Sequence, residues 1–552
     1  MTVVHAPVTR WLPRYKRAFL GPDLVAGLTV WALVVPESMA YASIAGVPVE
    51  YGLYSVPFAI LGYVVFGTSR RLVMGPTSTV AAMTAAAVAP VAVGTGSLYI
   101  ALVAALSLLV GAFFVLFGLL RLGWIAHFFA KPVLDGFIVG LGVFIAVGQL
   151  HKLVGTPKGH GNTVQQFWQV LSHAGDWSWT TVAVGAASLA VLFGMARLWP
   201  RVPGALVVLV AGIAAVTAFD LGAHGVALVG EVPTGYHFVP WSTVSLHDLV
   251  DLVPGALGIV VVAFAQSLAI AKSYARKDGE EVDANAELVA YGASSIGAGL
   301  LQGFPPAGSL SKTAAAAEAG EKTPVALLFT VVLVVATTLV LAGVFENLPE
   351  AVLGAVVIHA VWGMIDPAPL TRLRKARLPD FWLALAALAG VVLVGILAGI
   401  VVGVVLSLVM LIHRLDHPYV ASLGRRPDRS YSDLAADPDA VAVPGALVFR
   451  VDAPLIFANA EVILATMTAR LDEAGAGVTA VVLDFESVYE IDTEGADILV
   501  QLAEELRRRH LRVAVARAHA AVRGYLERTG ALAAIGPGNL YATVDEAVRA
   551  TA

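Results

Sequence analysis

Cysteine is absent from the 552-residue chain. Its absence excludes disulfide bonds, thiolate metal sites and a thiol nucleophile, and it does not decide the compartment. The sequence also offers no nucleophile beside a base and no cluster of metal-ligating residues. It therefore predicts no enzyme, no catalytic residue, no metal site and no cofactor.

Charge is scarce as well. Only 14% of the residues are charged, whereas a soluble domain carries about 25%. Between Leu20 and Ile412 the chain consists mostly of apolar runs, and charge becomes dense after Arg414. Several runs reach the ~20 residues that cross a bilayer as a helix. The composition excludes a soluble two-domain enzyme and predicts a polytopic α-helical membrane domain in a lipid bilayer.

Two further features are missing. The net charge of −5 gives no basic surface of the kind that binds nucleic acid. Residues 1–20 contain several cations but no short apolar stretch with a cleavage site, so we interpret them as a cytoplasmic N-terminal segment and not as a signal peptide.

Fourteen apolar segments can be placed. Two of them, 76–90 and 309–319, are too short to span a membrane alone. Because fourteen is even, both termini lie on one side. Lysine and arginine gather in alternate loops, against only Lys152 and Lys158 in the opposite ones, and this bias predicts cytoplasmic termini in a cytoplasmic (plasma) membrane. The segments are 23–44, 51–67, 76–90, 98–120, 131–150, 179–198, 203–219, 253–272, 286–301, 309–319, 323–343, 348–364, 380–395 and 397–413.

The two halves of the apolar region have proline-containing breaks at matching positions. Pro22 precedes Thr77 by 55 positions, and Pro254 precedes Ser309 by 55 positions. Each landmark is followed by a run of small residues. Seven segments per half is an odd number, so the halves are expected to be inverted relative to each other. Short, Gly/Pro-interrupted segments at matching positions indicate a substrate site near the membrane midplane.

The expected site suits an anion. Each short helix begins inside the membrane with unpaired N–H groups and the positive end of its dipole. Two such ends that face each other form an electropositive pocket without a fixed charge. Small residues allow the backbones to approach closely.

Five stretches, spread over both halves, carry a resemblance to a known family. They are 35–42 (VPESMAYA), 48–55 (PVEYGLYS) with 67–70 (GTSR), 266–273 (QSLAIAKS), 283–288 (DANAEL), and 303–305 (GFP) with 309–314 (SLSKTA). In this order they resemble the motifs of the SulP (sulfate permease-like) anion transporters. The resemblance implies a seven-plus-seven inverted repeat over residues 21–415. It further implies that segments one to four and eight to eleven form a core bundle, that the other six form a gate bundle, and that the protein is a homodimer.

The resemblance also implies a site between the starts of segments three and ten. Backbone N–H groups and hydroxyls there would bind the anion. The matching residues are Thr77, Ser78, Thr79, Ser309, Leu310 and Ser311.

Three further polar residues fall within the expected spans. Lys312 supplies either a positive field at the pocket or a side chain that snorkels to water. Glu37 is about 21 Å along its helix from Asp23, and it is either a binding or proton-carrying residue or a hydrogen-bonding residue of the core. His359, nearer a segment end, reads as an interface residue.

Gln266 departs from the family pattern, which has Glu or Asp at this position in many relatives. An amide cannot titrate. The coupling ion (a proton, a sodium ion or a counter-anion) therefore stays open, although Gln266 can still hydrogen-bond substrate.

The composition changes after Arg414. We interpret 416–441 as a linker and 442–552 as a small α/β domain of alternating strands and helices. Residues 482–487 (VLDFES) and 491–495 (IDTEG) resemble the STAS domain. In stand-alone relatives a serine near this point is phosphorylated; here Thr493 or Glu494 takes that place. Asp492 is expected to cap the following helix.

Together these features predict secondary active transport of small anions by alternating access. Sulfate, bicarbonate, chloride and dicarboxylates are all open as substrates. An anion channel is the first alternative, and a nucleobase permease of the same architecture is the second. The permease normally places carboxylates where this chain has Gln266 and Leu310. A signalling receptor fits the paired short segments least well.

Overall fold

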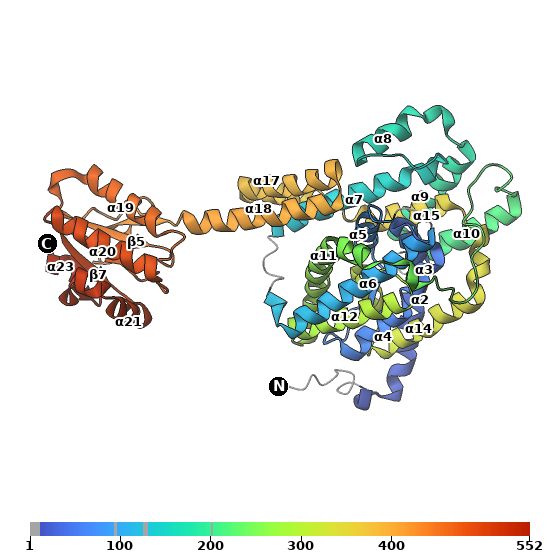
Figure 1. Ribbon diagram of the computed structural model, residues 1–552, viewed down its shortest axis with the longest axis horizontal. Helices are drawn as coiled ribbons and strands as arrows, with labels where there is room; N and C mark the ends of the chain where they lie inside the picture. The colour runs from blue at the N-terminus through green and yellow to red at the C-terminus, as the bar shows by residue number, and fades with distance from the viewer. Residues whose placement is uncertain (1–11, 93–95, 125–130, 200–201, 552) are drawn as a thin grey trace. The chain divides into compact units, whose positions relative to one another are not determined.

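The computed structural model (Figure 1) describes residues 12–92, 96–124, 131–199 and 202–551. The chain divides into two compact units, one up to Ser407 and the other from Leu408 onward. The first unit is helical, and the second is built on a β-sheet.

The first half of the helical unit is helical except for one short strand, which directly precedes a short helix. Its elements are α2 (Leu20–Ala45), α3 (Val49–Tyr54), α4 (Pro57–Phe66), β1 (Met74–Gly75), α5 (Ser78–Val88), α6 (Gly96–Leu119), α7 (Lys131–Val154), α8 (Thr163–Ser172), α9 (Trp179–Leu198) and α10 (Gly204–Phe219). The expected segment 51–67 is the pair α3 and α4.

The second half follows the same order. It comprises α11 (Leu246–Asp278), α12 (Ala284–Leu300), β2 (Ala307–Gly308), α13 (Leu310–Glu318), α14 (Val325–Ala336), α15 (Glu350–Trp362), α16 (Ala368–Ala376), α17 (Leu378–Ala389) and α18 (Ile396–Asp416). Every expected apolar segment coincides with a helix or helix pair. Within the described residues, eight helical stretches are long and apolar enough to span a membrane.

The sequence did not indicate α8 and α16. Both are short, and each carries polar residues that break up any apolar run. A search for bilayer-length apolar segments passes over such helices.

Helices of the two halves interleave. α12 packs against α6 and α4, α14 against α2 and α4, and α11 against α5 and α6. This is the expected core bundle. α7 packs against α17, α15 and α9 in the gate bundle. At Gly136 of α7 a β-carbon would lie 1.9 Å from the carbonyl oxygen of Ala384, so only glycine lets α7 and α17 approach this closely.

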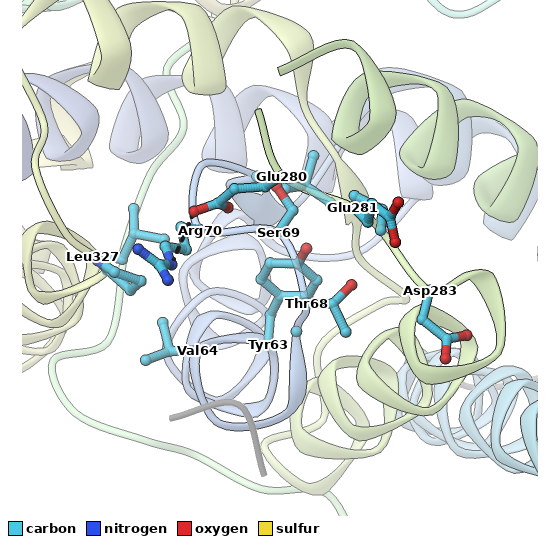
Figure 2. A pocket seen from close by; sticks show the side chains of 13 residues that line it. Tyr63, Val64, Thr68, Ser69, Arg70, Glu280, Glu281, Asp283 and Leu327 are labelled. Carbon is cyan, nitrogen blue, oxygen red and sulfur yellow. Dashed lines mark ion pairs between the residues drawn. The ribbon is translucent and has the colours of Figure 1, made fainter. Parts of the chain in front are cut away.

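A buried carboxylate fastens one loop of the core. Glu287, at the start of α12, is fully buried. It accepts hydrogen bonds from the Thr68 N–H at 2.7 Å, from the Thr68 hydroxyl at 2.6 Å and from the Tyr63 hydroxyl at 3.0 Å. Figure 2 labels Tyr63, which lies in α4, and Thr68, which follows this helix. The expected loop after α4 is thus held by an acid 219 positions away.

A second buried acid, Glu321, has no such partners. It lies in the loop between α13 and α14, is 1% exposed, and neither carboxylate oxygen has a hydrogen-bond partner among the described residues. Burial raises the pKa of Glu321 to about 8; Arg71 lowers this pKa, and Asp23 and Asp278 raise it. The folded protein therefore favours a neutral Glu321.

This acid predicts a pH dependence of stability. The folded-state pKa lies above the usual value of 4.5, so the stabilisation by the neutral form is complete below the unfolded pKa and is lost as pH rises toward 8. We expect the melting temperature of Glu321→Gln to match the wild type near about pH 5. The difference in favour of the variant should grow up to about pH 8 and then level off. The exposed Glu281→Gln variant is the control, and a pH-independent difference would contradict the prediction.

The second unit has a six-stranded sheet in the order β4-β3-β5-β6-β7-β8. Strands β5 to β8 run parallel, and β3 pairs antiparallel with β5 and β4. Its elements are β3 (Val420–Arg425), β4 (Tyr431–Asp433), β5 (Ala446–Val451), α19 (Ala460–Ala474), β6 (Ala480–Asp484), α20 (Thr493–Arg508), β7 (Arg512–Ala516), α21 (Ala520–Thr529), α22 (Ala531–Ile535), β8 (Leu540–Tyr541) and α23 (Val544–Thr551).

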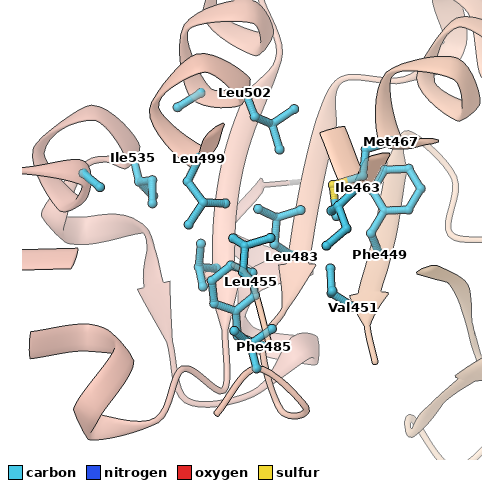
Figure 3. Close-up of a cluster of buried hydrophobic side chains, with 14 of the residues drawn as sticks. Phe449, Val451, Leu455, Ile463, Met467, Leu483, Phe485, Leu499, Leu502 and Ile535 are labelled. Atoms are coloured by element: carbon cyan, nitrogen blue, oxygen red, sulfur yellow. The ribbon is translucent and has the colours of Figure 1, made fainter. Parts of the chain in front are cut away.

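The sheet and its helices enclose an apolar core. Phe449 of β5 and Phe485, directly after β6, join Met467 of α19 and Leu499 of α20 in this core (Figure 3). Asp492 caps α20 as expected, since its carboxylate accepts the Gly495 N–H at 2.9 Å.

The stretch 416–441, interpreted from the sequence as a linker, contains β3 and β4. β3 joins the sheet through β5, with Ala421 opposite Arg450. Its polar composition misled the interpretation, because β4 is a short edge strand whose residues are all partly exposed.

Candidate functional site

The two short helices begin beside each other. β1 and β2, which directly precede α5 and α13, pair antiparallel with Met74 opposite Gly308 and Gly75 opposite Ala307. The Ser309 N–H also donates to the carbonyl oxygen of Val73 at 3.0 Å. Breaks that lie 234 positions apart in the sequence thus meet in space.

Each short helix is capped by a hydroxyl. The Thr77 hydroxyl accepts the Val80 N–H, and the Ser309 hydroxyl accepts the Lys312 N–H, both at 3.4 Å. The other N–H groups of the first turns have no partner within their own helix. Two positive dipole ends and several free donors are therefore concentrated at one place.

β2 is fastened to α11 as well. The Gly308 N–H donates to the Ser267 hydroxyl at 2.8 Å, and a β-carbon on Gly308 would lie 3.0 Å from that of Ser267. The preceding residue, Gln266, has a buried side-chain oxygen without a hydrogen-bond partner among the described residues. A buried amide oxygen without a partner is rare, and it leaves Gln266 able to bind a ligand.

Lys312 connects the site to α2. Its Nζ lies 2.5 Å from Oε2 of Glu37, 3.0 Å from the carbonyl oxygen of Pro76 and 5.3 Å from the centre of the Tyr41 ring. Lys312 is 1% exposed and Glu37 is 7% exposed. Lys312 therefore does not snorkel to water. It forms a buried ion pair that links α13, α2 and the residue before Thr77.

A cavity of about 690 Å³ adjoins this ion pair. Core helices α2 and α13 form one wall, and gate helices α9, α10 and α15 form the other. Five residues of α2 line it at every fourth position: Val25, Thr29, Leu33, Glu37 and Tyr41. This row covers about 24 Å at 1.5 Å per residue. The cavity follows α2 from its first turns to the starts of the short helices.

The structure brings most of the expected residues together. Glu37 and Ser311 line the cavity. Beneath that surface Lys312 is buried, and Thr77, Ser78, Thr79 and Ser309 are 4–8% exposed. Leu310 is 58% exposed and does not line the cavity, and neither does Gln266.

Two ring-bearing side chains, those of His359 and Tyr41, are among the lining residues that received no binding role from the sequence. His359, which we had interpreted as an interface residue, lines the cavity and packs edge-on against Phe193 at 5.0 Å between ring centres. Tyr41 also lines the cavity, and the Lys312 ammonium lies over its ring. The spacing of four between Glu37 and Tyr41 was the available signal, since it puts both on one face of α2.

A second cavity, of about 620 Å³, lies elsewhere in the helical unit (Figure 2). It is lined by Glu280, Glu281 and Asp283, and Arg70 is paired with Glu280 at 3.2 Å. Three carboxylates disfavour an anion, and none of the expected site residues lines this cavity.

Sequence comparison matches residues 20–387 to the Sulfate permease family and residues 437–547 to the STAS domain. A Mycobacterium tuberculosis (strain H37Rv) protein named probable sulfate transporter is 37% identical, with 99% of this chain and 98% of that protein covered. The chloroplastic sulfate transporter 4.1 of Arabidopsis thaliana is 30% identical over 98% of this chain and 82% of that one.

Solved structures share the fold. Murine solute carrier 26 family member A9, an anion transporter in an inward-facing state, superposes with a TM-score of 0.90 at 23% identity and covers 99% of this chain and 94% of that one. The transmembrane domain of the cyanobacterial bicarbonate transporter BicA gives 0.62 at 21% identity over 71% and 98%. The chain belongs to the sulfate permease family of multi-pass membrane anion transporters and carries a C-terminal STAS domain.

Proposed function

We propose that the protein is a secondary transporter that moves small anions across the cytoplasmic membrane by alternating access. The observation that carries the proposal is the meeting of two half-helix starts beside a cavity between the core and gate bundles. The N–H groups and hydroxyls of residues 77–79 and 309–311 would bind the anion. Lys312 and Glu37 would set the charge of the site, and Gln266 would bind from α11.

The cavity supports an inward-facing arrangement. The lysine and arginine distribution predicts that the first turns of α2 and the α9–α10 loop face the cytoplasm. Val25, Ala196 and Val202 line the cavity at those ends, so its opening would face the cytoplasm. Transport then requires the gate helices to move against α2 and α13. Inverted-repeat carriers typically move one bundle against the other around a fixed site.

Sulfate is the first substrate to test, because the sequence relatives bear that name. Bicarbonate, chloride and dicarboxylates compete with it as candidates. The test measures uptake of labelled sulfate into liposomes that contain the purified protein. Uptake is compared with and without sulfate inside the liposomes, and with and without each of a panel of competing anions outside. Saturation and trans-stimulation are expected of a carrier. Flux without either would favour the anion channel, and competition by nucleobases alone would favour the permease.

Ser311 offers a direct test of the site. Ser311→Leu places a bulky side chain in the cavity and removes a hydroxyl that can donate to an oxyanion. The loss of one such bond alone weakens binding roughly tenfold to a hundredfold, and blockage should reduce uptake further. Ser172→Leu at the exposed end of α8 is the matched control. Normal uptake by the well-folded Ser311→Leu protein would place the site elsewhere.

A further inference from the structure

α16 carries a concentrated positive charge that the transport site does not use. Three residues of its second half and the residue that follows the helix are cations: Arg372, Arg374, Lys375 and Arg377. All four side chains are exposed. None has an ion pair or hydrogen bond with another described residue. Four neighbouring cations repel one another, so an unpaired cluster of this kind is suited to an external anion.

The position of α16 indicates where that anion lies. α16 connects α15 to α17 and packs against α17 and α7, all in the helical unit. Trp362 at the end of α15 is 57% exposed, and Leu378 and Trp382 at the start of α17 are 57% and 61% exposed. Exposed tryptophans at helix ends are typical of a membrane–water boundary. α16 therefore lies along such a boundary.

Helix α16 is amphipathic, as helices that lie in a membrane interface are. Leu370 and Leu373, one turn apart, are only partly exposed, while the cations occupy the other faces. A basic helix of this kind lies in the headgroup layer with its apolar side inward. On the side that the charge bias assigns to the cytoplasm, the leaflet is rich in anionic headgroups.

An open groove on α16 fits one headgroup. Its volume is about 670 Å³, and Arg372 and Lys375 line it one helical turn apart. Asp366 also lines it, and its carboxylate accepts the Ala368 N–H at 2.9 Å in the turn that leads into the helix. A guanidinium and an ammonium side by side match the oxygens of a phosphodiester.

We propose that α16 binds the headgroup phosphate of an anionic phospholipid of the cytoplasmic leaflet, with Arg372 and Lys375 as its ligands. The leaflet rests on the orientation proposed above, whereas the lipid site does not depend on the transport mechanism. A soluble anion is disfavoured as occupant because exposed tryptophan and leucine side chains border α16 on both flanks. Such side chains contact lipid chains and gain nothing from a free ion.

Lipid titration tests the site. Full-length protein in detergent would be titrated with phosphatidylglycerol or phosphatidylcholine, and bound lipid counted by native mass spectrometry. We expect phosphatidylglycerol to bind more tightly. Each cation near an anionic surface contributes about a fivefold factor in affinity, so Arg372→Gln with Lys375→Gln should weaken binding about thirtyfold. All of these side chains are exposed, so the fold should persist.

The same helix provides the control. Arg374→Gln with Arg377→Gln removes the same charge outside the groove and should weaken binding less than about fivefold, the factor for one cation. Equal losses for both pairs would overturn the assignment, and so would equal binding of the two lipids. Full displacement of phosphatidylglycerol by millimolar inorganic phosphate would identify a soluble-anion site instead. Because lipid binding is measured without flux, its failure is distinguishable from a failure of the transport proposal.

Discussion

Lys312→Met is expected to abolish anion uptake and to destabilise the protein by about 3–5 kcal/mol, the usual cost of removing one partner of a buried ion pair. Its Nζ lies 2.5 Å from Glu37, and both side chains are buried. Methionine would leave the Glu37 carboxylate without a counter-charge in a low-dielectric site. Glu37→Gln should cost a similar amount, because it leaves a buried ammonium.

The double variant separates structure from transport. Lys312→Met with Glu37→Gln removes both charges together, and replacing a whole buried pair by neutral side chains is often neutral for stability. We therefore expect its melting temperature to return close to the wild-type value. Uptake should stay absent, because the cation that contacts the Pro76 carbonyl in front of α5 is gone. Thermal unfolding in detergent and uptake in liposomes supply the two measurements.

Two results for the double variant would contradict this prediction. Normal uptake by the double variant would make the ion pair a purely structural link between α2 and α13. A double variant as unstable as Lys312→Met would mean that the bond to the Pro76 carbonyl carries the stability. Lys152→Met is a useful control, since it removes a cation from the end of α7, away from the half-helix starts.

The sequence predicted the helices well because bilayer-length apolar runs have few alternative structures. It also predicted both half-helices, since the spacing from Pro22 to Thr77 and from Pro254 to Ser309 is the same. The confirmation is the β1–β2 pairing in front of them. That pairing itself is only two residues long, too short for any periodicity to indicate.

Long-range partners could not be inferred from local pattern. Lys312 and Glu37 each stand out as a charge within a predicted span, but the sequence of neither helix indicates that the two form an ion pair. The same holds for Glu287, which binds the loop at Thr68 from another helix. Such pairs depend on how the two halves interleave, and a single sequence carries no co-variation to show it. His359 was assigned to an interface for the same reason.

The small domain illustrates a different limit. Buried strands such as β6, in which all five residues are buried, stand out as apolar runs. β4 has no buried residue, and its composition is that of a turn. A three-residue edge strand without a buried face has no apolar alternation, the pattern that identifies half-buried strands.

Gln266→Glu is expected to give uptake a new dependence on protons or sodium. The wild-type amide carries no charge at any accessible pH, so we expect wild-type uptake in liposomes to need no sodium gradient. Its pH dependence should follow the ionisation of the substrate. A glutamate at the same place would add a carboxylate where the wild-type side-chain oxygen is buried without a partner.

That carboxylate has two ways to be stabilised. It can take up a proton or bind a sodium ion, and either event would couple the cation to transport. A charge-assisted contact of about 1.5–3 kcal/mol corresponds to roughly tenfold or more in apparent affinity, which uptake with and without imposed gradients would resolve. The variant can also stall, because an unpaired carboxylate in the membrane is costly. A stalled variant would recover uptake at low pH, where the carboxylate is neutral.

Gln149→Glu is the matched control for this experiment. Gln149 of α7 is also a buried amide whose side-chain oxygen has no partner among the described residues, but it belongs to the gate bundle and does not adjoin β2. A new carboxylate there should lower stability without creating cation dependence. Equal cation dependence in both variants would mean that any buried carboxylate produces it. Strict sodium dependence of the wild-type protein would contradict the role proposed for Gln266 and would place the coupling site on another residue.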